Sequence, residues 1–352
     1  MNDDFYVAFE EKFRGSEELI KERQKKYLKF INPLKILKDE VKALDIGCGR
    51  GEWISLLNEN GFNARGIDVN ESMVKVASQK GLNAAVNDAL GELKSLDESS
   101  LDIITAFQVV EHIKFDDVLE LIKEAKRVLA PCGILILETP NPENIMVGTQ
   151  WFYLDATHKN PIPCELLSFA THYYGLERNF IFKTNEKSPS EYERDMGIFD
   201  VFEGVSPDYS VIVQKNGDQS ELFDEAFAVT PGVNLAQISA SYNNKYNELA
   251  NKHAELLNKH NELKQQVDGI LSSYIQRYEA AQNELNDMLN SKSWRITKPL
   301  RVSMKIAKKI VGRLKRYARK SKILMSKEMI INEQAKTLTK KELQIYNLLK
   351  KD

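Results

Sequence analysis

Three glycines stand at alternate positions in the segment LDIGCGRGEW (44–53). They follow an apolar segment with the pattern of a buried strand and precede a helix pattern, so bare backbone could approach a ligand closely there. The spacing is G-x-G-x-G rather than the G-x-G-x-x-G of dinucleotide-binding folds, since the residue three past Gly49 is Glu52. Gly47 and Gly49 are therefore candidate ligand-binding residues, and the neighbouring strand ends must identify the ligand.

Carboxylates follow at the ends of the next apolar strands. Asp68 closes the second strand, where its oxygens could accept hydrogen bonds from both hydroxyls of a ribose. Asp88 closes the third strand, where it and the backbone N–H of Ala89 could bind the edge of an adenine. Ligands of open α/β sheets bind at the carboxyl ends of the strands, so these groups form one predicted site, which also includes Asp45. The alternative for each aspartate is a helix N-cap or a turn.

The elements that would position these groups alternate between short apolar runs and helix-length amphipathic stretches, which is typical of an α/β fold with a parallel sheet. Helix patterns occupy 51–60, 71–79 and 116–129. Two further strands, 179–184 and 209–214, complete a predicted seven-stranded, Rossmann-like sheet whose last pair is antiparallel. The five strands expected to run parallel are 41–46, 63–68, 84–88, 101–107 and 133–139.

The segments ALDIGCGRG, GIDVN, NDA, VVEHI and RVLAPCGILILETPNPEN together resemble the motifs of class I S-adenosylmethionine-dependent methyltransferases over residues 38–140. One departure is Cys132, which replaces the first glycine of the Pro-Gly-Gly turn usual in that family. The resemblance implies S-adenosylmethionine as the cofactor and methyl transfer as the activity. Arg14, in an FRGS stretch, is expected to close over the donor or the acceptor. The other residues expected to bind the cofactor are Asp45, Gly47, Gly49, Asp68, Val69, Asp88, Ala89 and Gln108.

An oxygen acceptor needs help to lose its proton, either from a base or from a metal that lowers the hydroxyl pKa. His112 follows Glu111 after the fourth strand, facing the expected place of the methyl group. His158 lies in the loop 151–163, where Asp155 is expected to orient its imidazole. These three, His112, His158 and Asp155, are the predicted catalytic residues. The alternative is that they only make structural hydrogen bonds.

Substrate contacts are predicted from Tyr153, Asn141 and Glu111, with Tyr153 in the same loop as His158. The Glu-His pair also resembles one in ubiquinone-type O-methyltransferases. No metal site is expected, because Gln108 stands one helical turn before the pair where a carboxylate-rich cluster would need an acid. The three cysteines lack C-x-x-C spacing, so neither a zinc site nor a disulfide framework is indicated.

The longer series FRGSEELIKERQKKYL, GCGRGEW, FQVVEHI, ETPNPEN, FYLDATHKNP and DYSVIV resembles bacterial methyltransferases of surface-glycan synthesis over residues 10–215. Within that group it is most similar to the chain-terminating enzymes of O-antigen synthesis. The resemblance implies O-methylation of the non-reducing terminal sugar of a lipid-linked polysaccharide, with a glycosyltransferase or polymerase as partner. The alternatives are a small-molecule or quinone-type O-methyltransferase and a non-catalytic coiled-coil scaffold for glycosyltransferases.

From residue 242 the apolar residues recur in alternating steps of four and three, and KYNELAN, KHAELLN and KHNELKQ repeat at seven residues. This heptad pattern predicts a coiled coil and hence a homo-oligomer, with His253 and His260 on the seam. The alternative is a single amphipathic helix packed on the enzyme. The predicted organisation is a methyltransferase domain at 1–216, a linker at 217–235, the coiled coil at 236–290 and a basic tail at 291–352.

The formal net charge of −2 conceals a strongly basic region near the C-terminus. Residues 288–327 contain fourteen Lys or Arg residues and no acidic residue. Apolar residues recur there at helical spacing, which predicts an amphipathic helix lying on anionic lipid of the inner leaflet. Nucleic acid is not expected as a partner, because the tail has no aromatic stacking platform. Without a signal peptide or a membrane-spanning apolar run, the chain is expected to be cytoplasmic and peripheral on the inner face of the bacterial inner membrane.

Overall fold

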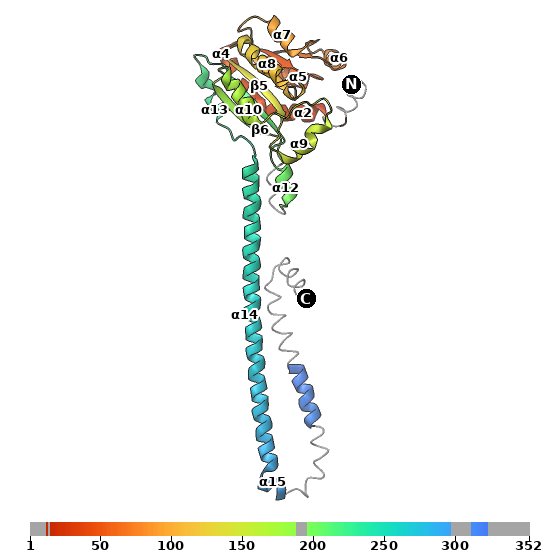
Figure 1. Cartoon of the computed structure of the whole chain (residues 1–352), viewed down its shortest axis with the longest axis vertical. Coiled ribbons are helices and arrows are strands. Elements are labelled where there is room, and N and C mark those ends of the chain that lie inside the picture. Colours follow the sequence, from red (N-terminus) through yellow and green to blue (C-terminus); the bar gives the residue numbers. More distant parts are fainter. Residues whose placement is uncertain (1–11, 13–14, 188–195, 297–310, 323–352) are drawn as a thin grey trace. The chain divides into compact units, whose positions relative to one another are not determined.

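The computed structural model describes residues 12, 15–187, 196–296 and 311–322 of the chain. It divides into two compact units, Met1–His253 and Ala254–Asp352, which are described separately. The first unit contains an α/β domain built on a single sheet (Figure 1).

A sheet of seven strands forms the centre of the first unit, in the order β3-β2-β1-β4-β5-β7-β6. Neighbouring strands from β3 to β5 pair in parallel, whereas β7 runs antiparallel to both β5 and β6. The predicted α/β class, the seven strands and the antiparallel last pair are confirmed. The strands are β1 (Lys42–Ile46), β2 (Asn63–Asp68), β3 (Ala84–Val86), β4 (Leu101–Phe107), β5 (Leu129–Pro140), β6 (Arg178–Thr184) and β7 (Asp208–Gln214).

The strand order reverses between β1 and β4. The chain moves outward from β1 through β2 to β3 and then returns to the opposite side of β1 with β4. In open α/β sheets the connections on the two sides of such a point leave in opposite directions, and ligands bind at the carboxyl ends of the strands there. The ends of β1 and β4 are therefore where a ligand site is expected.

Helices cover both faces of the sheet (Figure 1). Residues of α7 (Ala89–Ser95), α8 (Phe115–Val128) and α10 (Cys164–Tyr173) pack on one face. Residues of α3 (Leu28–Ile31) and α5 (Glu52–Glu59) pack on the other. Strands covered on both faces read as continuous apolar runs, which is the pattern of residues 134–137 in β5. The other helical elements of this unit's described residues are α2 (Glu17–Gln24), η1 (Lys25–Tyr27), α4 (Leu34–Leu37), α6 (Glu71–Gln79), η2 (Val110–His112), α9 (Ile145–Thr149), η3 (Trp151–Leu154), α12 (Ile198–Glu203), η4 (Ser220–Phe223) and α13 (Asp224–Phe227).

The segment predicted as a linker, 217–235, is folded onto the sheet instead. Phe223 of η4 is fully buried among the residues that α3 and α5 cover. Further along, the backbone N–H of Lys183 donates to the carbonyl oxygen of Pro231 at 2.9 Å. The backbone N–H of Val233 donates to the hydroxyl of Ser206 at 3.0 Å. The apolar side chains of this segment complete the core.

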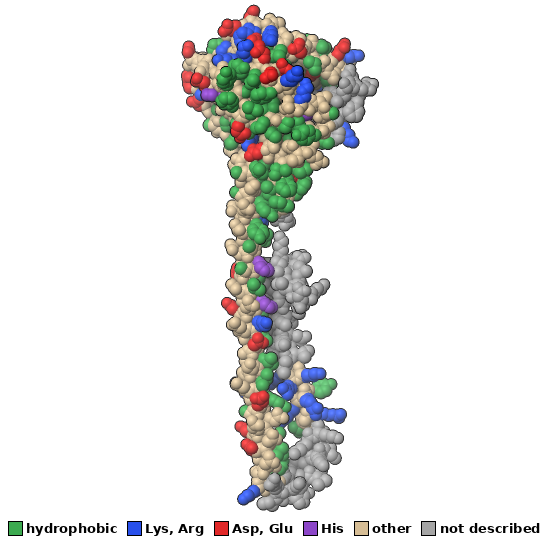
Figure 2. Space-filling view, viewed as in Figure 1, with side chains coloured by type: hydrophobic (Ala, Val, Ile, Leu, Met, Phe, Trp, Pro, Cys, Tyr) green, Lys and Arg blue, Asp and Glu red, His purple; other side chains and the backbone are tan. Residues whose placement is uncertain are grey.

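A single continuous helix of 56 residues, α14 (Leu235–Asn290), occupies the region predicted as a coiled coil and is followed by α15 (Lys292–Ile296). The first turn of α14 contacts the α/β domain. Ile238 packs against Val201 and Val205, and the backbone N–H of Leu235 donates to Glu143 Oε1 at 3.0 Å. The helical state agrees with the prediction, while pairing with a second helix stays a prediction. Large exposed apolar side chains follow one another along the helix (Figure 2), namely Tyr246, Leu249, Leu257, Ile270, Leu271, Tyr274, Ile275, Tyr278, Leu285 and Met288.

The described part of the basic tail, residues 311–322, is helical. The Arg319 guanidinium lies 4.0 Å from the centre of the Tyr278 ring. Most of the predicted basic tail, 291–352, falls at 297–310 and 323–352, outside the described residues. Among the residues that the structure describes, no helix combines the length and the apolar character needed to cross a bilayer.

Candidate active site

The glycine-rich turn after β1 is held against the end of β2. The backbone N–H groups of Gly47 and Cys48 both donate to the carbonyl oxygen of Ile67, at 2.8 and 2.9 Å. Gly47 has φ +70°, and a Cβ added there would lie 2.4 Å from Val109 Cγ2. Gly49 has φ +53°, which is also left-handed. Only glycine adopts these conformations at low cost, so the predicted role of the turn as a close-approach surface agrees with its geometry.

Asp68 lies beside this turn, as the sequence predicts. Its Oδ2 accepts the backbone N–H of Gly49 at 2.9 Å and its Oδ1 accepts that of Asn70 at 2.8 Å. An ionised carboxylate only accepts hydrogen bonds, so this group suits the hydroxyls of a ribose. The next residue, Val69, is 74% exposed and offers an apolar surface beside the carboxylate.

Two other aspartates have structural partners. Asp88 follows the end of β3 by two residues and is the N-cap of α7, where its Oδ1 accepts the backbone N–H of Gly91 at 2.8 Å. The sequence analysis gave a helix N-cap as the alternative to ligand binding for this aspartate, and the structure shows that cap. Ala89 is then the first residue of the helix. Asp45 is buried inside the sheet and accepts the hydroxyl of Thr105 at 2.7 Å. The bond ties β1 to β4 immediately before the turn, so Asp45 supports the site from within.

The N-terminal segment covers the start of α5. Arg14 itself lies outside the described residues, but the carbonyl oxygen of its neighbour Gly15 accepts a hydrogen bond from the Arg50 guanidinium at 3.2 Å. In α2, Glu17 pairs with Lys80 at 2.5 Å. Gly15 of the FRGS stretch therefore lies beside Arg50 of the donor turn, and the closing role of Arg14 stays a prediction.

S-adenosylmethionine fits the donor turn by these observations. The glycine conformations expose main chain, Asp68 can accept ribose hydroxyls, and Val69 can contact an adenine ring. Gly47, Gly49, Asp68 and Val69 are the residues that would hold it. When bound, S-adenosylmethionine supplies a methyl group on a positively charged sulfonium, which a nucleophile can attack.

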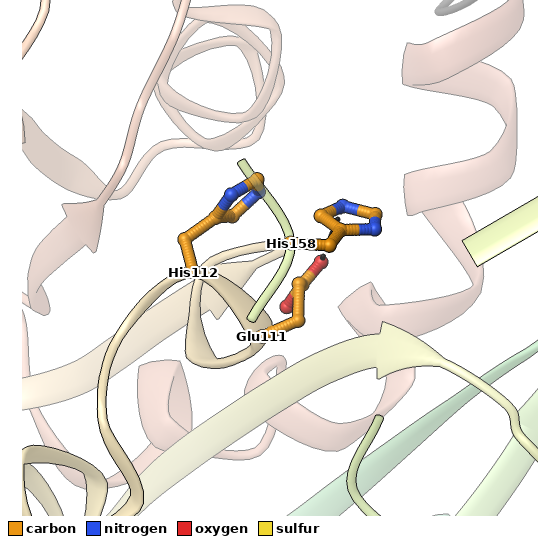
Figure 3. Close-up of side chains that lie close together, drawn as sticks. All are labelled: Glu111, His112 and His158. Carbon is orange, nitrogen blue, oxygen red and sulfur yellow. Dashed lines mark ion pairs between the residues drawn. The ribbon is translucent and has the colours of Figure 1, made fainter. Parts of the chain in front are cut away.

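A second group of residues gathers after β4, and its first member is Glu111 of η2 (Figure 3). Glu111 is 0% exposed. Its Oε2 accepts the hydroxyl of Thr139 at 2.9 Å, while its Oε1 is buried without a hydrogen-bond partner among the described residues. Burial, with a smaller contribution from the charges of Asp208 and Glu138, raises the pKa of Glu111 to about 8. Glu111 was predicted only as a substrate contact, but it is the buried centre of this group.

The two predicted histidines lie beside Glu111 and beside each other. Their ring centres are 4.7 Å apart. His158 Nε2 lies 3.9 Å from Glu111 Oε1 and 4.0 Å from Asp155 Oδ2. Its Nδ1 lies 2.6 Å from the carbonyl oxygen of Phe152. A carbonyl can only accept, so Nδ1 carries the proton and Nε2 of the neutral ring carries the lone pair.

Asp155 does not orient His158 as predicted, because the carbonyl of Phe152 does so. Asp155 Oδ1 instead accepts the hydroxyl of Thr157 at 2.6 Å, and Thr157 Oγ1 lies 2.8 Å from His112 Nδ1. With its hydrogen directed to Asp155, Thr157 must accept from His112. Asp155 therefore fixes the other histidine, through a threonine that the sequence did not single out.

The structure also brings together a metal-binding set that was not expected. Glu111, His112 and His158 each offer a ligand atom, and the three atoms lie within 4.8 Å of one another. The sequence predicted no metal site because Gln108 stands one helical turn before Glu111 and His112, where a carboxylate-rich metal cluster would need an acidic residue. His158 supplies the third group from a loop 46 residues later, which spacing alone does not reveal.

Gln108 belongs to a separate buried network rather than to the cofactor turn. It adopts φ +56°, and its amide Nε2 donates to Glu138 Oε1 and to Asp208 Oδ1, each at 3.2 Å. Tyr27 donates its hydroxyl to Glu138, and Asn185 donates to Asp208 at 2.7 Å. Burial raises the pKa of both carboxyls, that of Glu138 to about 7. None of these partners of Gln108 was predicted as a site residue.

The two remaining predicted substrate contacts differ in kind. Asn141 is fully buried, and its side chain bonds to the carbonyl oxygen of Ser206 at 2.8 Å and to the backbone N–H of Glu143 at 3.1 Å. It stabilises a turn and is not exposed to a substrate, which corrects the prediction. Tyr153 is 60% exposed on η3, between the exposed Trp151 and Leu154. It therefore remains available to an acceptor near His158.

Comparison with known proteins places this geometry in a family. A methyltransferase domain model matches residues 19–177. Ubiquinone biosynthesis O-methyltransferases of Coxiella burnetii and Hahella chejuensis are 32% and 31% identical over 127 and 132 residues. These matches cover 33% and 34% of this chain and 53% and 55% of the relatives, so the chain spans about half the length of the curated relatives.

A crystal structure of an S-adenosylmethionine-dependent methyltransferase from Archaeoglobus fulgidus is similar over its whole length. It is 31% identical, has a TM-score of 0.54, and is covered completely by 60% of this chain. The glycine turn, the five parallel strands β1 to β5 and the aspartate at the end of β2 occur within the region that the family model matches. The chain belongs to the class I S-adenosylmethionine-dependent methyltransferases.

Proposed function

We propose that this methyltransferase transfers a methyl group to a hydroxyl of a small, ring-bearing acceptor such as a phenol. The observation that carries the proposal is the position of His158, whose Nε2 can accept a proton beside Glu111 at the carboxyl end of the sheet (Figure 3). In the transfer, the carbon–sulfur bond of the donor breaks, a carbon–oxygen bond forms, and the acceptor hydroxyl loses its proton. An enzyme that methylates oxygen needs a place for that proton.

His158 is the proposed base. Its Nδ1–H is committed to the carbonyl of Phe152, so its Nε2 lone pair points to the side of Glu111. The Phe152 ring packs against the imidazole with centroids 4.5 Å apart, which restricts its rotation. A fixed tautomer and a fixed ring plane are what a general base requires.

The relatives and the surface near His158 support a small apolar acceptor. Curated relatives at 31 to 32% identity are named for ubiquinone biosynthesis. In this chain Trp151, Tyr153 and Leu154 expose 39 to 60% of their surface on the element that immediately precedes the base loop. Exposed aromatic side chains of this kind can pack on the ring of an acceptor.

The second candidate acceptor is the terminal sugar of a lipid-linked surface glycan, methylated to end chain growth. The observation that favours it is the part of the chain beyond the family match, in particular α14 and the basic helical residues 311–322. We propose that the exposed apolar side chains of α14 pair with those of a second copy, and that the basic tail binds anionic lipid of the inner leaflet. A lipid-linked acceptor would be found there, together with the polymerase that extends it.

Labelled S-adenosylmethionine distinguishes the acceptors. The full chain is incubated with catechols and monophenols in one series and with oligosaccharides of varied terminal sugar in another. The proposal predicts transfer to a phenolic oxygen, and a His158→Ala variant that is slower by about 10²- to 10⁴-fold while still binding the donor. Transfer to one terminal sugar alone would establish the second candidate. Transfer to nitrogen or carbon acceptors alone would contradict both.

A further inference from the structure

We propose that Ile198, Phe199 and Phe202 of α12, here called the α12 face, pack against the same face of a second copy of this chain. The α14 helices of the two copies run parallel in this arrangement. Pairing of α14 belongs to the proposed function, and the contact through α12 rests on it. The surface lies within the first unit, which ends at His253. Figure 2 shows hydrophobic side chains gathered at α12, beside the first turns of α14.

The α12 face is apolar and exposed. Ile198 and Phe199 are each 54% exposed, and Phe202 is 36% exposed. Phe202 stands four and three residues after the other two, so all three lie on one side of the helix. The remaining apolar residue of α12, Val201, is buried against Ile238 of α14. Large apolar side chains gathered on the surface of a globular domain are typical of a site that binds another protein.

The α12 helix covers the beginning of an apolar stripe on α14. Leu235, Ile238 and Tyr242 of α14 pack into the apolar cluster that α12 forms with this helix. Tyr246 and Leu249 come next and are 63% and 59% exposed. Successive members of this series are three or four residues apart, so all five lie on one side of α14. A helix that packs along the exposed part of the stripe therefore meets α12 at the end nearest the α/β domain.

The occupant follows from the heptad repeat of α14. The stripe continues as the seam that repeats at seven residues, and such a seam pairs with another helix of the same pattern, which a second copy supplies. Two identical copies joined along a parallel seam are related by an axis that runs between the two helices. Because α12 covers the seam side of each α14 at the same height, the two α12 faces meet across this axis. The contact is therefore isologous and buries the same three side chains from both copies.

The charges of α12 favour a second copy over lipid. The helix contains two acidic residues, Asp200 and Glu203, and no Lys or Arg, so it does not suit an anionic membrane. Both acids have partners within the chain. Asp200 Oδ2 accepts the backbone N–H of Gly197 at 2.7 Å, and Glu203 pairs with Lys187. The α12 face itself carries no charge, so pairing two such faces leaves no like charges opposed.

The test compares two exposed phenylalanines of the same domain. Association of the full chain is measured by sedimentation equilibrium for the wild type, Phe199→Asp and Phe169→Asp. Phe169 is 64% exposed on α10 and serves as the control. Phe199→Asp should raise the dissociation constant at least about tenfold, because it places an acid against its own copy across the axis, whereas Phe169→Asp should leave it unchanged. Unchanged binding of S-adenosylmethionine verifies that both variants are folded.

A cysteine at the same position tests the orientation of the two copies. The native cysteines, Cys48, Cys132 and Cys164, are all buried, so an introduced surface thiol reacts selectively. A short bismaleimide reagent should link two copies of Phe199→Cys, because the α12 faces meet at the axis. It should not link two copies of Phe169→Cys.

Each outcome decides a different statement. A wild type that stays monomeric would overturn the pairing of α14 together with the α12 contact, and would leave the proposed methyl transfer intact. Equal association of the wild type and Phe199→Asp would overturn the α12 contact alone. Weaker association without linkage of Phe199→Cys would overturn the parallel arrangement. If Phe199→Asp instead loses binding to vesicles of phosphatidylcholine and phosphatidylglycerol in equal parts, with association unchanged, the α12 face binds lipid and the inference is wrong.

Discussion

Replacing Glu138 with glutamine should make the unfolding free energy of the α/β domain less dependent on pH. Glu138 is a buried carboxyl that accepts hydrogen bonds from Tyr27 and Gln108, and it shares Gln108 with Asp208. Burial, and then the charge of Asp208, raise its pKa from 4.5 to about 7 in the folded protein. The folded state therefore holds the Glu138 proton more tightly than the unfolded state does.

The sign follows from the number of protons bound in each state. Below pH 4.5 both states are protonated, and the stabilisation linked to Glu138 is fully present. As the pH rises towards 7, the unfolded chain has lost this proton and the folded chain still holds it, so stability falls. The shift from 4.5 to about 7 corresponds to at most about 3.5 kcal/mol, at roughly 1.4 kcal/mol per pKa unit. Sharing of the proton with Asp208 reduces the part that belongs to Glu138.

The measurement is urea unfolding of the full chain at pH 5 and pH 8, followed by tryptophan fluorescence. Glu138→Gln should gain about 1 to 2.5 kcal/mol relative to the wild type between the two pH values. The amide can replace the acid in the network, because Tyr27 also contacts Ser210 and can accept once its hydrogen points there. Glu165→Gln, at an exposed position of α10, serves as control. If the difference between Glu138→Gln and the wild type is the same at both pH values, the reasoning is refuted.

Three further outcomes are expected. Gly47→Ala should weaken S-adenosylmethionine binding by about tenfold or more, measured by calorimetry. The added Cβ would lie 2.4 Å from Val109, and the left-handed backbone costs a residue with a Cβ roughly 1 to 2 kcal/mol. Unchanged affinity would refute the role of the turn. Thr157→Val should slow transfer about tenfold with donor binding unchanged, because His112 loses the bond that fixes its tautomer, whereas Thr149→Val on α9 should have no effect. If α14 self-associates along its heptad seam, substitution of His253 and His260 by leucine should strengthen the oligomer in sedimentation analysis, because polar residues on an apolar seam cost stability; unchanged association would contradict the predicted seam.

The part of the site that would hold S-adenosylmethionine could be predicted from the sequence, because its residues directly follow two neighbouring strands. The turn at Gly47 and Gly49 follows β1 directly, and Asp68 ends the neighbouring parallel strand, so adjacency in the sheet follows from the alternation of strands and helices. The same reasoning did not distinguish Asp68 from Asp88. Both end an apolar run, but β3 stops two residues before Asp88, whose carboxylate then caps α7.

The residues on the acceptor side of the site, and the buried network beside them, are brought together by contacts between segments far apart in the sequence. The spacing of residues along the chain does not predict such contacts. Glu138 and Asp208 meet because β7 inserts antiparallel between β5 and β6, with Glu138 opposite Ser210. Tyr27 reaches them from a segment 111 residues before Glu138. The loop that contains His158 was predicted from the sequence. The backbone carbonyl that orients the imidazole could not be predicted, because every residue type has the same carbonyl. Asn141 was predicted to contact substrate because it is a polar residue near the end of a strand. Its side chain instead bonds to backbone groups of the protein.

One short segment, from the end of β4 to η2, sets the distance between donor and acceptor. Val109 lies against Gly47 of the donor turn, Gln108 is bonded to Glu138 and Asp208, and Glu111 is bonded to Thr139. Methyl transfer requires the reacting atoms to be in line at about 3 to 3.5 Å, and a segment anchored on both sides can keep that spacing for different acceptors. The choice of acceptor then falls to parts that β4 does not fix. These are the η3 loop and the elements after β7, and the elements after β7 lie beyond residues 19–177 that the family model matches.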